Sequence, residues 1–169
     1  PLYHTYPFTV TMLLPLLTGA KISFPANINF EEISVCMQQT NVTILLGVPR
    51  LFTSFYETIT YTLSHLPLLK RLLLSLALAC HKPCQRLFGI NLASKALAKL
   101  HKKFGSKLRL MISGSAALEP KVSRAFSFWG FTLLEGYGLT EAAPVVSFNM
   151  PGATKTASAG KPWRSSRKG

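Results

Sequence analysis

The sequence predicts an α/β fold, part of a large domain in which a mostly parallel sheet is flanked by helices. One observation is that short β-prone apolar segments alternate with helical patterns along most of the chain, which is typical of parallel sheets. The other is that two loops rich in small residues, 114–118 and 136–138, each follow a predicted strand. Ligands of such sheets bind beyond the carboxyl ends of the strands, so these loops are the candidate ligand-binding segments.

The first quarter of the chain predicts two helix-to-strand steps. Residues 8–20 are apolar with small residues and predict a helix that stops at Gly19, and the β-prone letters KISF at 21–24 predict a strand. Residues 29–41 predict a second helix, which Asn29 is suited to cap. Residues 42–49 then predict a buried strand that ends in a turn. Apolar positions expected on one side of the second helix are Ile33, Val35 or Cys36, and Met37.

The middle of the chain, from residue 50 to about 105, is mostly helical in pattern. One segment, 66–80, carries leucines at three- and four-residue spacing, and another, 91–104, sets an apolar stripe against lysines. The leucines are Leu69, Leu72, Leu73 and Leu76; the stripe is Leu92, Ala96 and Leu100, opposite Lys95, Lys99, Lys102 and Lys103. Two interpretations of this basic amphipathic helix stay open: a helix packed on the domain with a solvated basic face, or one that docks to a membrane surface or an anion.

The last third repeats the alternation of strand and helix. Residues 107–113 predict a strand and 114–118 a tight loop of small residues. Residues 119–130 predict a helix with an acid and a proline in its first turn, where both suit the N-terminus. Residues 131–138 predict the next strand and its exit. Both candidate loops therefore fall at the same edge of the predicted sheet.

Composition narrows the classes of partner. Hydrophobic residues make up 48% of the 169 residues and charged residues 15%, but no apolar run approaches the roughly 20 residues of a membrane-spanning helix. The formal net charge of +13 creates a field that attracts anions such as nucleotide or coenzyme phosphates and anionic lipid. The aromatic residues lie in apolar runs without a recognised binding pattern, so nucleic acid is not an expected partner.

The cysteines predict little chemistry. Cys36, Cys80 and Cys84 are odd in number, and CHKPC lacks the second pair that a zinc site of this type requires. Reduced thiols in a cytoplasmic protein are the favoured interpretation, and a zinc site is the alternative.

The loop SGSAAL at 113–118 has two interpretations. Gly114, Ala116 and Ala117 leave the backbone uncovered, so a flat ring or an acyl chain could approach it closely. Small residues after a strand also serve tight packing of the following helix. The loop alone does not separate these interpretations.

The letters EGYGLTE at 135–141 supply a set of groups suited to a nucleotide. Gly136 and Gly138 let the main chain turn beside a ligand, and Tyr137 offers an aromatic face for a base. Thr140 offers a hydroxyl to a phosphate oxygen, and Glu141 offers a hard oxygen ligand to Mg²⁺. The position of this set at a strand exit, downstream of the other small-residue loop, favours a nucleotide site.

These motifs resemble those of the adenylate-forming, acyl-activating (AMP-binding) enzymes, and among them the long-chain fatty-acid–CoA ligases. The resemblance runs through PLYH, TGA, LLGVPRLF, LRLMISGSAAL, EGYGLTEAAPVV and AGKP, nearly the whole chain. The long helical segment between GVPRLF and LRLMISG is similar to that of the long-chain branch.

The resemblance implies roles for individual residues. Tyr137 would lie against adenine, Thr140 at the α-phosphate, and Glu141 on Mg²⁺ as the metal ligand. His4 would stand near the acyl and phosphate site, so that Thr140, Glu141 and His4 form the catalytic set; a helix-start residue bonded to the backbone is the alternative for His4. The cofactor-binding set implied by the resemblance is Gly114, Ser115, Ala116, Glu135, Gly136, Tyr137, Gly138 and Thr140.

The resemblance also implies an incomplete site. The family's upstream phosphate loop, its downstream ribose-binding aspartate and its small C-terminal domain with a catalytic lysine have no counterpart in these residues. We therefore expect residues 1–162 to be part of an adenylation domain and residues 163–169 to be a basic tail, produced by truncation or a change of frame. This chain alone is expected to be inactive.

The function implied is activation of a fatty acid with ATP and Mg²⁺ to an acyl-adenylate, followed by transfer to the thiol of coenzyme A. The alternatives are transfer to the phosphopantetheine of a carrier protein, linked to phospholipid reacylation, and a non-catalytic membrane-associated relative. The expected location is cytoplasmic, with peripheral contact to an anionic membrane as a further expectation.

Overall fold

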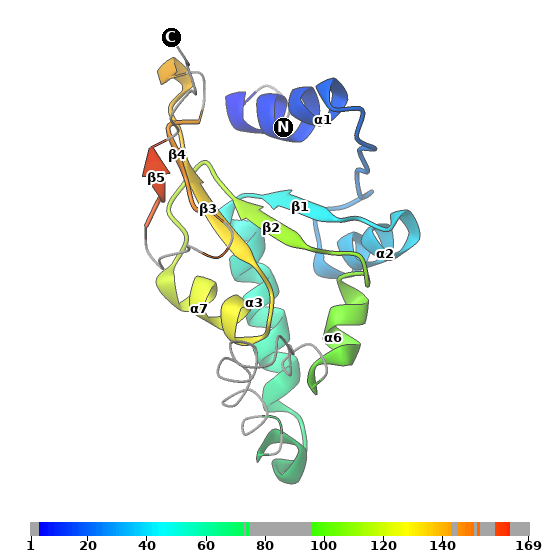
Figure 1. The fold of residues 1–169 in the computed structure, drawn as a ribbon. Coiled ribbons are helices and arrows are strands. Elements are labelled where there is room, and N and C mark those ends of the chain that lie inside the picture. Colours follow the sequence, from blue (N-terminus) through cyan, green and yellow to red (C-terminus); the bar gives the residue numbers. More distant parts are fainter. Residues whose placement is uncertain are drawn as a thin grey trace.

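The computed structural model describes residues 4–72, 74, 96–142, 145–150, 152 and 158–162. It has the predicted α/β architecture, with helices packed on a sheet (Figure 1). Within the described residues, no helix combines the length and the apolar character that crossing a bilayer requires.

Within the described residues, the sheet has five strands that follow one another in chain order. Strands β1 (Ile44–Gly47), β2 (Leu110–Ser113) and β3 (Leu133–Tyr137) are parallel, as the sequence predicts. Strands β4 (Ser147–Phe148) and β5 (Lys161–Pro162) continue the sheet in antiparallel pairing. The sheet is therefore mixed, with a parallel half that contains both predicted loops at its carboxyl edge.

The register of the parallel strands brings the ends of β1 and β2 level, and β3 continues two residues further, to Tyr137. Gly47 pairs with Ser113, and Ser113 in turn pairs with Glu135. The Gly114 N–H donates to the Gly47 carbonyl at 3.2 Å, which extends the pairing one residue beyond β2. The segments that leave β2 and β3 therefore begin beside one another.

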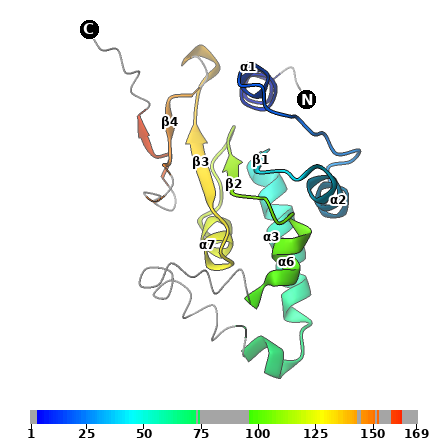
Figure 2. The same cartoon turned by 45° about the vertical axis from the view of Figure 1, so that its right-hand side comes forward.

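The helices lie in two groups. α3 and α7 pack on each other, as do α2 and α6, and these helices cover one face of the sheet while η1 and α1 lie beyond the opposite face (Figures 1 and 2). The helices are η1 (Pro7–Leu13), α1 (Leu14–Leu17), α2 (Phe30–Thr40), α3 (Pro49–Ser64), α6 (Ala98–Lys103), α7 (Pro120–Phe128) and the single turn η2 (Thr140–Ala142).

Local sequence signals explain where helices begin. The Asn29 side chain accepts a hydrogen bond from the Glu32 N–H at 2.8 Å, so it caps α2 as predicted. Pro49 and Pro120 occupy the first turns of α3 and α7, where the missing N–H costs no hydrogen bond. α2 ends at Asn41, which adopts the left-handed conformation that Asn tolerates well.

The core beneath the sheet is rich in aromatic side chains. Phe52 and Phe55 of α3 and Phe126 of α7 are almost fully buried, and the rings of Phe52 and Phe126 meet edge to face with centroids 6.0 Å apart. Phe104 joins the same cluster, 4.9 Å from Phe131. This packing fixes α3 and α7, and with them the two crossovers that order the parallel strands.

Some sequence predictions are wrong. Residues 21–24 have no strand neighbour among the described residues and form irregular coil, since β propensity needs a paired neighbour to become a strand. Ile44 in β1 is 44% exposed, so this strand is only partly buried. Ala96 is exposed and Leu97 is buried in its place, because α6 begins only at Ala98.

Several predictions lie outside the described residues. They concern part of the leucine-rich segment, part of the basic segment, two cysteines and the tail. The residues are Leu73, Leu76, Cys80, Cys84, Leu92 and Lys95, and residues 163–169. Of the cysteines, Cys36 is described and is a free thiol.

His101 makes folding stability depend on pH. Its ring stacks on Phe131 at 4.1 Å, and Nε2 lies 2.9 Å from the Trp129 carbonyl oxygen. Burial lowers the pKa of His101, against the smaller opposing effect of that backbone hydrogen bond. The pKa of His101 is therefore lower in the folded state than in the unfolded state, where it is about 6.5. Its contribution to the free energy of unfolding is full above this pH and is lost as pH falls through the folded-state pKa.

We therefore expect the free energy of unfolding to decline as pH is lowered below about 6.5, and to decline less in His101→Gln. Urea denaturation across this pH range measures both, with the exposed His65→Gln as the matched control. An identical pH profile for His101→Gln and the parent would contradict the prediction.

Candidate functional site

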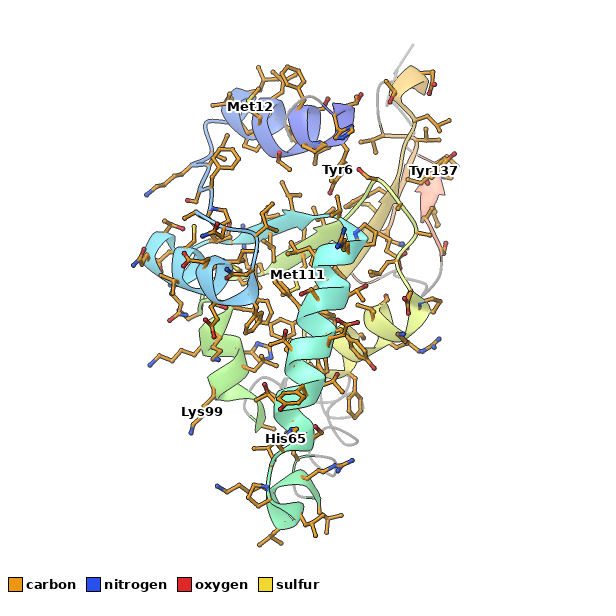
Figure 3. The ribbon with its side chains drawn as sticks, turned by 180° about the vertical axis from the view of Figure 1, so that it is seen from behind. Tyr6, Met12, His65, Lys99, Met111 and Tyr137 are labelled. Carbon is orange, nitrogen blue, oxygen red and sulfur yellow. The ribbon has the colours of Figure 1, made fainter. Side chains whose placement is uncertain are left out.

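The candidate site lies at the carboxyl edge of the parallel strands. The loop after β2 and the exit of β3 both open there, and η1 lies above them, on the sheet face away from α3 and α7 (Figures 1 and 2). Tyr6, which precedes η1, and Tyr137, the last residue of β3, both lie on this side of the sheet (Figure 3). Three segments that are distant in sequence thus converge.

The loop after β2 is held close to its neighbours. Gly114 is buried, and a Cβ placed on it would lie 2.4 Å from the Tyr6 ring, a distance that no side chain tolerates. Ser115 has a φ of 74°, in the left-handed region that is sparsely populated by residues other than glycine. Ala116 is exposed. The loop therefore turns sharply, and its backbone at Ser115 and Ala116 is open to a ligand.

Two buried hydroxyl groups border this loop. Among the described residues, the Tyr6 hydroxyl and the Ser113 Oγ are the buried side-chain atoms without a hydrogen-bond partner. Burial raises the pKa of Tyr6 to about 12, so its hydroxyl keeps its proton and remains a donor. Buried polar groups are usually paired, which makes these two hydroxyls candidates to bind a polar ligand.

The exit of β3 presents the predicted tyrosine to solvent. Tyr137 is 49% exposed, and its carbonyl accepts a hydrogen bond from the Val146 N–H at 2.9 Å. Its backbone is thereby fixed while its ring face stays accessible. Gly138, which follows it, is exposed.

Gly136 is required by packing inside the protein. A Cβ at this position would lie 2.9 Å from the ring of Phe148 on the antiparallel strand β4. The predicted role of Gly136 in ligand binding stays a prediction, since this contact alone explains the glycine.

Glu135 faces the loop that follows β2. Burial raises the pKa of its carboxyl group, and hydrogen bonds from the Leu118 N–H and the Ser123 hydroxyl offset only part of this rise. Its backbone carbonyl accepts from the Asn149 N–H at 3.0 Å. Glu135 therefore links β3 to the adjacent loop and helix, and its predicted contact with a cofactor stays a prediction.

Thr140 and Glu141 lie on η2, beside the N-terminal segment. The hydroxyl oxygens of Thr5 and Thr140 are 3.3 Å apart, which joins residues 135 positions distant in the chain. Glu141 is exposed. The predicted phosphate-binding hydroxyl and the predicted metal ligand are thus adjacent at the open edge of the site.

His4 is exposed and directly precedes Thr5, so the structure brings it to the same edge. Its carbonyl accepts from the Phe8 N–H at 3.0 Å, as expected at the start of a helix. Both predicted roles for His4 remain compatible with this position.

The donor groups present fit Mg²⁺ only in part. No group of three or more His, Cys, Asp or Glu side chains able to hold a metal occurs within the described part of the chain. Mg²⁺ is commonly held by one or two carboxylates together with substrate phosphates and water. Glu141, next to Thr140 in the sequence, fits a site in which one carboxylate holds Mg²⁺ together with substrate phosphates and water.

Sequence reasoning missed the contribution of residues 5 and 6. Thr5 and Tyr6 contact the other segments only through the tertiary fold, at Thr140 and Gly114. Ser113 begins the small-residue loop in the sequence, but no sequence pattern indicates that its hydroxyl is buried and without a hydrogen-bond partner. The PLYH letters of the resemblance were the signal nearest to these residues.

Comparison with known proteins extends these observations. The family model described as AMP-binding enzyme matches residues 1–167. Long chain acyl-CoA synthetase 1 of Arabidopsis thaliana is 32% identical over 126 residues, which are 68% of this chain and 18% of that protein. The chain thus spans about a fifth of the length of such curated relatives.

Solved structures show the same fold. The anthranilate CoA ligase AuaEII in complex with anthranoyl-AMP aligns with a TM-score of 0.62 at 21% identity, over 95% of this chain and 24% of that one. A long-chain-fatty-acid-CoA ligase from Archaeoglobus fulgidus aligns with a TM-score of 0.58 at 15% identity, over 96% and 27%. The match to the family model over residues 1–167 shows that the chain belongs to the AMP-binding enzyme family.

Proposed function

We propose that this chain forms the adenylate-binding part of an AMP-forming acid–CoA ligase. The family match supports this function, and so does the resemblance to an acyl-CoA synthetase. The single structural observation that carries it is the convergence of residues 4–6, the loop at 114–116 and the segment 137–141 at one sheet edge. That edge is where α/β sheets bind their ligands.

The residues at this edge have complementary roles in the proposal. The exposed ring face of Tyr137 stacks on adenine, and the backbone of 114–116 borders the base and the acyl group. The Thr140 hydroxyl donates to the α-phosphate. Glu141 holds Mg²⁺, which when bound offsets the negative charge that develops on the phosphates.

The chemistry requires this distribution of donors. A carboxylate oxygen of the acid attacks the α-phosphorus of ATP, the bond to the β,γ-phosphates breaks, and pyrophosphate leaves. Two anions approach in this step, so oriented donors lower its barrier. The thiol sulfur of coenzyme A then attacks the acyl carbon, a thioester forms, and AMP leaves with the electron pair of the broken acyl–phosphate bond.

A long-chain fatty acid is the proposed substrate. Its support is the similarity to a long chain acyl-CoA synthetase and the long connection between β1 and β2, whose described part contains α3 and α6. The Tyr6 ring packed on Gly114 provides an apolar wall beside the loop. Transfer to a carrier-protein thiol is the alternative to coenzyme A, and no contact among the described residues favours it.

ATP–pyrophosphate exchange by the complete protein tests the proposal. We expect exchange that depends on both Mg²⁺ and a long-chain fatty acid, and acyl-CoA formation once coenzyme A is added. Parallel assays with acetate, benzoate and malonate show which acid the site accepts, and a carrier protein replaces coenzyme A in a further arm. Absence of exchange with every acid would contradict the proposed function.

A further inference from the structure

An exposed tip of leucines and basic residues follows α3. Residues 68–72 are helical, and Leu68 and Leu69 are 83% and 69% exposed. Lys70 and Arg71 come directly after them and are exposed as well. Two large apolar side chains adjoining two cations at a protruding turn are unusual on a surface that contacts only water. We call residues Leu68, Leu69, Lys70 and Arg71 the leucine–basic tip.

The charge around this tip is of one sign. The sequence contains no acidic residue between Glu57 and Glu119, a stretch that includes the tip and α6. Lys99 and Lys102 of α6 are exposed, and the last turn of α6 is basic. This stretch of the chain therefore has an excess of positive charge that attracts anions. Glu31 and Glu32, in the first turn of α2, are the carboxylates on the helix that packs on α6.

The tip lies away from the candidate site. His65, just before the tip, and Lys99 lie in the lower half of Figure 3, whereas Tyr6 and Tyr137 lie in its upper half. A carrier protein that delivers its thiol would have to bind near the site, so it is a poor occupant for this surface. Nucleic acid would use the cations but would leave Leu68 and Leu69 exposed.

We propose that the leucine–basic tip is a docking site for an anionic lipid surface. Lys70 and Arg71, with the lysines of α6, attract the headgroups, and Leu68 and Leu69 enter the boundary between headgroups and acyl chains. Tyr61, on the preceding turns of α3, is 69% exposed and has the amphipathic ring typical of membrane interfaces. Charge and apolar exposure at one place together select lipid.

Vesicle co-sedimentation of the complete protein tests this docking site. Phosphatidylcholine vesicles with and without phosphatidylserine are compared at low and high salt. We expect binding only to the anionic vesicles, with a decline as salt is raised. Leu68→Ser/Leu69→Ser and Lys70→Gln/Arg71→Gln are each expected to weaken binding by about tenfold.

The matched control is Leu16→Ser/Leu17→Ser. These α1 leucines are 60% and 76% exposed, but the sequence has no Lys or Arg before Lys21. Because all the substituted side chains are exposed, circular dichroism should show unchanged folding in each variant. The control should bind vesicles as the parent does.

Three results would overturn the proposal: binding that is equal on neutral vesicles, binding that survives both tip variants, or binding that is lost only in the α1 control. Binding of single-stranded RNA through Lys70 and Arg71 without vesicle binding would also overturn it, since the surface would then serve nucleic acid. Vesicle binding does not require adenylation, so these outcomes are independent of the exchange assay.

Discussion

Replacing Glu141 with alanine in the complete protein is expected to lower ATP–pyrophosphate exchange by about 100-fold or more. Glu141 is an exposed carboxylate on the single turn η2, next to Thr140. In the described residues, Glu141 is the carboxylate next to the proposed phosphate-binding hydroxyl of Thr140. Removal of one group that stabilises transition-state charge commonly costs two to three powers of ten in rate.

The dependence of exchange on Mg²⁺ concentration distinguishes a loss of metal binding from a structural effect of the Glu141 substitution. Glu141→Asp keeps the charge on a shorter side chain, so its residual exchange should rise with Mg²⁺ concentration, whereas Glu141→Ala should stay low. Glu119→Ala is the matched control, because Glu119 is also exposed and pairs with Lys121 at 2.7 Å on the surface. Parent-like exchange in Glu141→Ala would show that Glu141 is not the metal ligand.

The parallel half of the fold could be predicted because its signals are local. Asn29 caps α2, Pro120 opens α7, and the apolar letters of β2 and β3 lie between turn residues. Each signal acts within a few residues of the element it defines. The positions of both loops at the carboxyl edge then follow from parallel pairing alone.

The remaining strands depend on long-range contacts. β4 and β5 contain two residues each and exist because they pair with β3 and with each other. No period of hydrophobicity can be read over two residues. Conversely, residues 21–24 have high β propensity but no strand neighbour in the described part, and they form irregular coil.

The candidate site likewise combines residues that could be predicted from the sequence with contacts that depend on the tertiary fold. Tyr137, Thr140 and Glu141 could be proposed from their chemical types and their order after a strand. The contact between Thr5 and Thr140 could not, because 135 positions separate the two residues and their meeting depends on where η1 lies. The apolar packing of Tyr6 on Gly114 likewise appears only in the folded chain.

Because the Tyr6 ring packs on Gly114, Gly114→Ala is expected both to destabilise the protein and to impair adenylation. The added Cβ would lie 2.4 Å from the Tyr6 ring, so the ring or the loop must move. Gly114 is not among the residues with positive φ, so alanine brings no backbone strain of that kind. Overpacking of a buried position typically costs about 1–3 kcal/mol, which urea denaturation can measure.

A second substitution identifies the cause. If the clash with Tyr6 is responsible, Tyr6→Leu/Gly114→Ala should be more stable than the sum of the two single changes predicts, because leucine is smaller than the ring. The same double variant should recover part of the affinity for ATP in the exchange assay. Additive effects on stability would show that the Tyr6 ring is not the cause, and a loss of ATP affinity that persists in the double variant would make Gly114 a residue of the binding surface itself. Either result distinguishes a glycine required for packing from one required for close approach of the nucleotide, which the sequence alone left open.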